Sequence, residues 1–71
     1  MPAEEVFFVE GTVLVVILEF HQAQLRTSDG HMFAITRRTV GLDYAELRDG
    51  DRVRCEVTRA LPRVLRAWRM T

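Results

Sequence analysis

The stretch from residue 5 to residue 19 limits the possible folds more than any other part of the chain. Val, Phe, Ile and Leu dominate it, and Gly11 interrupts it. Branched and aromatic residues favour strands, and a glycine inside a strand indicates a bulge or a sharp bend. One bent strand can pair with neighbours on both sides, as the closure of a small barrel requires.

The following 17 residues predict a β-hairpin. Residues 21–28 alternate between apolar and polar side chains, which is typical of a half-buried strand. Asp29-Gly30 is a strong signal for a tight turn. Residues 31–36 then return as a strand, in which we expect Phe33 and Ile35 to point inward.

Two more strands are expected near the C-terminus, after a short helical segment. Within 42–49, Asp43 can cap one or two helical turns and Glu46 can reach back to the cap, while Gly50 can end the segment in a left-handed conformation. Residues 52–58 alternate again. Residues 63–70 alternate less regularly, which indicates a strand with a bulge.

The order of these elements predicts a single domain over residues 1–71, since a chain of 71 residues is short for more than one. The fold class is all-β: a five-stranded barrel of the oligonucleotide/oligosaccharide-binding (OB) type, with one short helix between strands three and four. An SH3-like barrel is the alternative, but its helical turn usually falls just before the last strand.

Several motifs resemble bacterial translation initiation factor one and its S1-like relatives, and more distantly the cold-shock domains. The similar segments are Gly11-Thr12-Val13-Leu14-x-Val16, Asp29-Gly30-His31, Leu47-x-x-Gly50-Asp51-Arg52-Val53-x-x-Glu56-Val57 and Arg66-x-Trp68-Arg69. The resemblance covers about residues 9–69. It implies an OB barrel that binds RNA. Two loops depart from the family pattern, 18–21 and 37–44, so a divergent relative is expected.

Composition favours a cytoplasmic protein outside the membrane. Cys55 is the only cysteine, so no intramolecular disulfide can form, and small secreted domains usually need such bonds. Its alternation with Val53 and Val57 predicts a buried thiol. The apolar run 13–18 is too short to span a membrane, and no basic segment of the signal-peptide type precedes it.

The sequence offers no catalytic constellation, no metal site and no motif for a cofactor. Ser28 is the only serine, and it belongs to the predicted turn, where it would be solvated and without a base. His21 and His31 lie at opposite ends of one predicted strand, with no obvious third ligand. We therefore expect a protein that is not an enzyme.

Nucleic-acid binding is the first functional hypothesis, with RNA or another single strand as partner and the ribosome as a further one. Net charge is zero, but all ten Arg follow residue 25, whereas four Glu precede it. OB barrels bind strands on the outer face of strands two and three, between flanking loops. The predicted interface comprises Phe20, His21, Gln22, Gln24, Arg26, Met32, Thr36, Arg37, Arg38, Arg59 and Arg63.

A protein partner is the second hypothesis. Both faces of the first strand are apolar, with Phe8 and Leu14 on one parity and Phe7 and Val15 on the other. One small core does not need so many apolar residues. The excess could form a patch for a homodimer or another protein.

Overall fold

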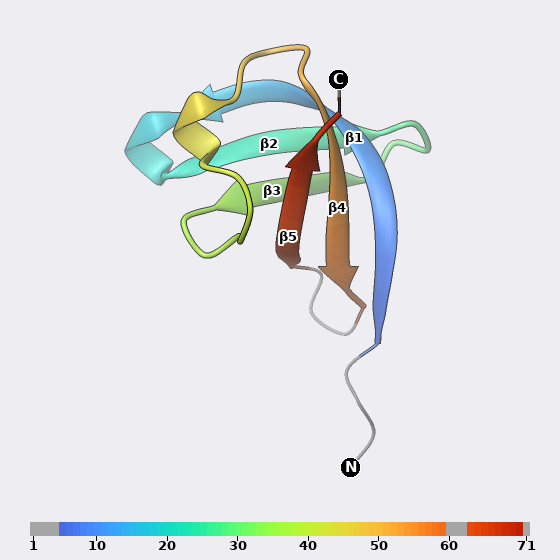
Figure 1. The fold of residues 1–71 in the computed structure, drawn as a ribbon. Coiled ribbons are helices and arrows are strands. Elements are labelled where there is room, and N and C mark those ends of the chain that lie inside the picture. The colour runs from blue at the N-terminus through green and yellow to red at the C-terminus, as the bar shows by residue number, and fades with distance from the viewer. Residues whose placement is uncertain (1–4, 60–62, 71) are drawn as a thin grey trace.

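A computed structural model describes residues 5–59 and 63–70 of the chain. Five antiparallel strands form one sheet in the order β3-β2-β1-β4-β5, which curls into an OB-type half-barrel (Figure 1). The strands are β1 (Val6–Ile17), β2 (Gln22–Thr27), β3 (Met32–Thr36), β4 (Arg52–Thr58) and β5 (Val64–Arg69). The predicted fold class is therefore confirmed.

The long first strand connects the two halves of the barrel, as its length predicted. Its first half, from Val6 to Thr12, pairs with β4, and its second half, from Gly11 to Ile17, pairs with β2. Gly11 lies where both neighbours approach. A Cβ atom there would come within 3.3 Å of the Arg26 carbonyl oxygen and of Leu25 Cβ. The glycine thus permits close packing, while the bulge falls at Leu14, between Val13 and Val15.

The core consists of inward side chains from every strand. Alternation buries Ala23, Leu25 and Ile35 completely, as the period of two predicted. The fully or nearly buried apolar residues are Val13, Ala23, Leu25, Ile35, Leu47, Val53, Cys55, Val57, Val64 and Ala67. Phe33 covers this core in an edge-to-face contact with Phe7, whose ring centroid lies 6.5 Å away.

The segment after β3 closes the barrel between β3 and β5. Val40 forms an isolated parallel bridge with β5: its N–H donates to Leu65 O at 2.8 Å, and its carbonyl accepts from Ala67 N at 3.0 Å. The Thr39 hydroxyl adds a bond to Val64 O. A short loop segment around Val40 therefore pairs with the edge of β5. No local sequence pattern predicted this pairing.

The expected helix between strands three and four is a single 3-10 turn, η2 (Tyr44–Glu46). Asp43 caps it as predicted, because its carboxylate accepts from Ala45 N at 2.9 Å. Gly50 has the expected positive φ, 91°. One turn suffices here because Leu47 is already buried in the core directly after it.

Two details of the strands differ from the sequence-based expectation or refine it. β1 ends at Ile17, and a second 3-10 turn, η1 (Leu18–Phe20), replaces the predicted last residues of the strand. The bulge expected in β5 is confirmed, since Leu65 is the extra residue between the pairs Glu56–Arg66 and Val57–Val64. Neither helical turn of the described residues is long and apolar enough to cross a membrane.

Candidate functional site

The outer face of β2 and β3 holds five of the predicted interface residues. The strand register places Gln22 opposite Thr36 and Arg26 opposite Met32, with Gln24 between them. Met32 is 51% exposed, and Arg26 is exposed as well, whereas both Gln side chains are half-buried. This face therefore offers one cation and one flexible apolar side chain.

Phe20 and His21, the two residues directly before β2, have different surroundings. Phe20 is 69% exposed in η1. His21 has a left-handed backbone with φ 55°, and its Nδ1 shares a hydrogen bond of 2.9 Å with the Tyr44 hydroxyl. Its ring also meets the Tyr44 ring edge to face, with centroids 6.1 Å apart. His21 thus ties η1 to η2, a role that its position in the sequence did not reveal.

The predicted phosphate-binding arginines do not gather on the same face. Arg37 and Arg38 are exposed in the turn after β3. Arg59 and Arg63 lie at the other end of the barrel, where β4 ends beside the start of β1. Arg59 is held there, because its Nε lies 3.1 Å from Glu5 Oε2 and its guanidinium lies 4.8 Å from the Phe7 ring centroid.

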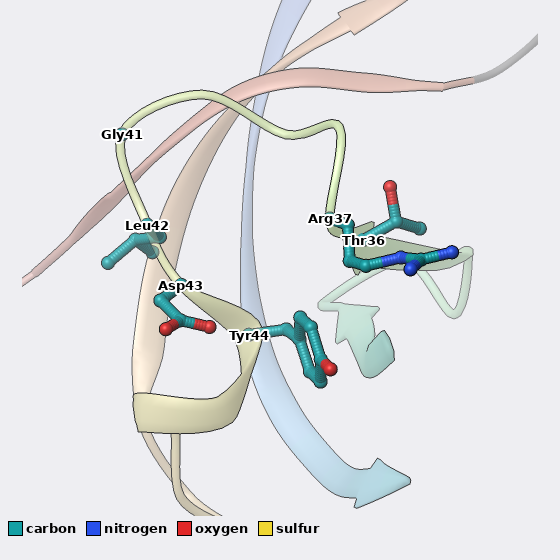
Figure 2. A pocket seen from close by; sticks show the side chains of 6 residues that line it. All are labelled: Thr36, Arg37, Gly41, Leu42, Asp43 and Tyr44. Atoms are coloured by element: carbon teal, nitrogen blue, oxygen red, sulfur yellow. The ribbon is translucent and has the colours of Figure 1, made fainter. Parts of the chain in front are cut away.

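A pocket of about 380 Å³ opens between the turn after β3 and η2. Figure 2 shows its lining residues: Thr36, Arg37, Gly41, Leu42, Asp43 and Tyr44. The Arg37 side chain extends away from the carboxylate of Asp43 in this view. The guanidinium of Arg37 and the carboxylate of Asp43 are therefore not placed to bind one small ligand together.

A cluster of exposed aromatic and cationic groups lies on the outer face of β1, β4 and β5. Alternation turns Phe8, Arg54 and Trp68 outward, because Val53 and Cys55 point into the core. The rings of Phe8 and Trp68 are 6.4 Å apart and are 53% and 43% exposed. The Arg54 guanidinium lies 5.3 Å from the Phe8 centroid. We call Phe8, Arg54 and Trp68 the aromatic patch.

On this face, Arg54 has no carboxylate partner among the described residues. Its neighbours are paired: Arg52 lies 3.7 Å from Glu10, and Arg66 lies 4.0 Å from Glu56. A hollow of about 300 Å³ lies next to Phe8 and Arg54, with Glu10 and Ser28 on its rim. No sequence pattern predicted this patch, since Phe8 and Trp68 meet only through the strand register.

Two titratable groups have shifted pKa values, and neither belongs to the aromatic patch. The pKa of Asp29 is lowered to about 2, because the Thr27 hydroxyl and His31 donate hydrogen bonds to its carboxylate. Burial raises the pKa of the Cys55 thiol to about 11. The first group stabilises the β2–β3 turn, and the second is an inert core thiol, as predicted.

Nothing in the described part of the chain brings together three or more His, Cys, Asp or Glu side chains in position to hold a metal ion. Cys55 is fully buried, and each His is engaged by a neighbouring side chain, Tyr44 for His21 and Asp29 for His31.

Comparison with known proteins identifies the fold. No family model matches the chain, and no curated protein matches it. Among solved structures it is similar to apo-CusF residues 6–88 from Escherichia coli, at 18% identity and a TM-score of 0.66. The match covers 97% of this chain and 92% of that one. It supports an OB-like barrel and does not extend to the initiation-factor or S1-like family.

This comparison corrects two expectations. The prediction of an RNA-binding module is wrong: the solved structure that the chain resembles is that of CusF, and the comparison gives no support for RNA binding. The physical reason is that the arginines expected to bind phosphates do not lie on one face of the barrel. The expected cytoplasmic location is contradicted as well by the comparison with CusF. The presence of a single cysteine does not distinguish a reducing from an oxidising compartment, because a buried lone thiol such as Cys55 is compatible with both.

Proposed function

We propose that this domain is a non-catalytic protein-binding module that uses the aromatic patch. The exposed Phe8–Trp68 pair beside Arg54 carries the proposal. Trp, aromatic rings and Arg are the groups that contribute most to protein interfaces. Solvent exposure of two large rings is unfavourable for the isolated domain, so a covering partner would gain free energy.

The partner's chemistry follows from the charges around the patch. Arg54 has no carboxylate within ion-pair distance in the described part of the chain, whereas Arg52 and Arg66 do. An incoming carboxylate would therefore meet an unpaired guanidinium that the Phe8 ring holds in place. The exposed rings of Phe8 and Trp68 suit an adjacent apolar side chain. We infer a partner segment with an acidic residue next to an aliphatic or aromatic one.

Selection of peptides from a random display library on the folded domain tests this inference. We expect enriched peptides to place Asp or Glu next to an apolar residue. Binding should weaken about thirtyfold or more in Trp68→Ala, the effect of losing about 2 kcal/mol at an interface hot spot.

The charge requirement has a matched control. Arg54→Gln should also weaken peptide binding, whereas Arg52→Gln, two residues away on the same face of β4, should leave it almost unchanged. Peptides without an acidic residue, or affinities that do not respond to either patch variant, would refute the proposal.

A further inference from the structure

The end of β1 and η1 expose a second group of apolar side chains, separate from the aromatic patch. Leu14, Val15, Leu18 and Phe20 are exposed by 42, 42, 56 and 69%. Residues 13–18 include no charged or polar side chain. Few soluble proteins leave such a stretch uncovered, since contiguous apolar surface favours association.

The backbone of this segment also has a free edge. Pairing of β1 with β4 ends at Thr12. Val13 then exchanges hydrogen bonds with the backbone of Gly50 and Asp51, at 2.8 Å each. Beyond Val13, β2 pairs with one side of β1, and no other strand of the described residues pairs with the opposite side. Figure 1 shows β1 continuing past the start of β4.

Edge strands of soluble proteins usually avoid further pairing through charged residues, proline or a covering element. The free edge at 14–17 has neither a charge nor a proline. Outside the pairing of β1 with β2, residues 14–17 make no backbone hydrogen bond within the described part of the chain, so the outer edge is available to another extended strand.

We propose that a second copy of this chain pairs with this edge, so that two β1 strands lie antiparallel around a two-fold axis. Identical edges form a closed pair in this arrangement, with the same residues on both sides. An uncharged segment meets an identical uncharged segment, so no charge is buried without a partner.

Charge at the two ends of the segment supports the antiparallel order. Glu19 is the first charged residue after the run, and Arg52 lies opposite Thr12 at its beginning. Arg52 is already paired with Glu10. Antiparallel pairing keeps the two Glu19 side chains at opposite ends of the interface, whereas parallel pairing would bring these like charges together. The same order joins the two η1 turns to the interface, where Leu18 and Phe20 can cover the partner strand.

The size of the segment predicts a weak dimer. Stable interfaces bury about 800 Å² on each partner, and this domain has 5175 Å² of surface in total. Four strand residues and one short turn cover only part of that area. We therefore expect a concentration-dependent dimer with micromolar rather than nanomolar affinity.

Sedimentation velocity from micromolar to millimolar protein tests the proposal, with Val15→Glu as the variant. Val15 points outward and is 42% exposed, so the change leaves the core intact. Symmetry brings two new carboxylates into one interface, which should raise the dimer dissociation constant about a hundredfold or more. Val6→Glu is the matched control, because Val6 is 40% exposed at the other end of the same strand.

A measurement on the unmodified chain keeps the test independent of the variants. Amide hydrogen exchange should slow at residues 14–17 as the protein concentration rises. A wild-type chain that stays monomeric over the whole range would overturn the proposal. So would a dimer that Val15→Glu leaves intact, or one that Val6→Glu weakens equally. Neither variant lies in the aromatic patch, so peptide binding and dimer formation can fail separately.

Discussion

Replacement of Gly41 by alanine should destabilise the fold more than the same change at a comparable glycine. Gly41 has φ 100°, and a Cβ atom there would lie 2.6 Å from the Ala67 carbonyl oxygen. The methyl group therefore meets rigid backbone of β5, and the two segments must move apart. That movement breaks the Val40 bridge that closes the barrel.

The cost can be worked from these contacts. An unfavourable backbone conformation costs about 1–3 kcal/mol. Loss of the two Val40 hydrogen bonds, at 2.8 and 3.0 Å, adds about 0.5–1.5 kcal/mol each. The sum is about 2–6 kcal/mol, out of a total stability of roughly 4–10 kcal/mol for a chain of this length. Gly41→Ala should therefore lower the free energy of unfolding by about half.

Gly50→Ala supplies the control. Gly50 has a similar φ, 91°, but a Cβ atom added there would meet no other part of the chain within 4 Å. That variant should carry only the conformational cost of about 1–3 kcal/mol. Chemical denaturation of both variants measures the difference. Equal destabilisation would refute the reasoning, because contact with β5 would then contribute nothing.

Three further predictions concern individual side chains. Tyr44→Phe removes the bond to His21 and should cost about 0.5–1.5 kcal/mol by denaturation, with larger amide shifts in η1 than elsewhere. Because the pKa of Asp29 falls from 3.8 to about 2 on folding, its contribution to stability is complete above pH 3.8 and disappears as the pH falls toward 2. Asp29→Asn should flatten the acid limb of a stability–pH profile. Cys55, with its pKa raised to about 11, should react with a thiol reagent only after unfolding.

Local patterns were sufficient to predict most of the fold. Alternation located β2 and β4, and it placed Phe33 and Ile35 inward because a strand turns successive side chains to opposite faces. Cap and turn residues located η2 and the β2–β3 hairpin. These signals depend on neighbours in the sequence, so a single chain displays them.

Long-range contacts could not be predicted in the same way. Closure by Val40 depends on residues about 25 positions away, and it leaves no periodic pattern. The aromatic patch has the same origin. Phe8 and Trp68 come from the two ends of the chain, and only the register across β4 brings their rings together.

The functional prediction failed at a different step. The topology was correct, but one barrel architecture serves many unrelated functions, so the location of a site on the fold does not show what binds there. The arginines illustrate this point. The sequence placed Arg59 in the predicted interface. In the structure, an ion pair with Glu5 and a contact with the Phe7 ring hold it at the far end of β1.

The bulge at Leu14 explains why both parities of β1 are apolar. Before it, odd-numbered residues point inward, as Val13 does, whereas after it the even-numbered Val16 packs against the core. One extra residue has reversed the alternation, so an uninterrupted period would have buried Val15 instead. Part of the apolar excess is thus required by the core. Val15 and its exposed neighbours have no such requirement, and the proposed pairing with a second copy would account for their apolar character.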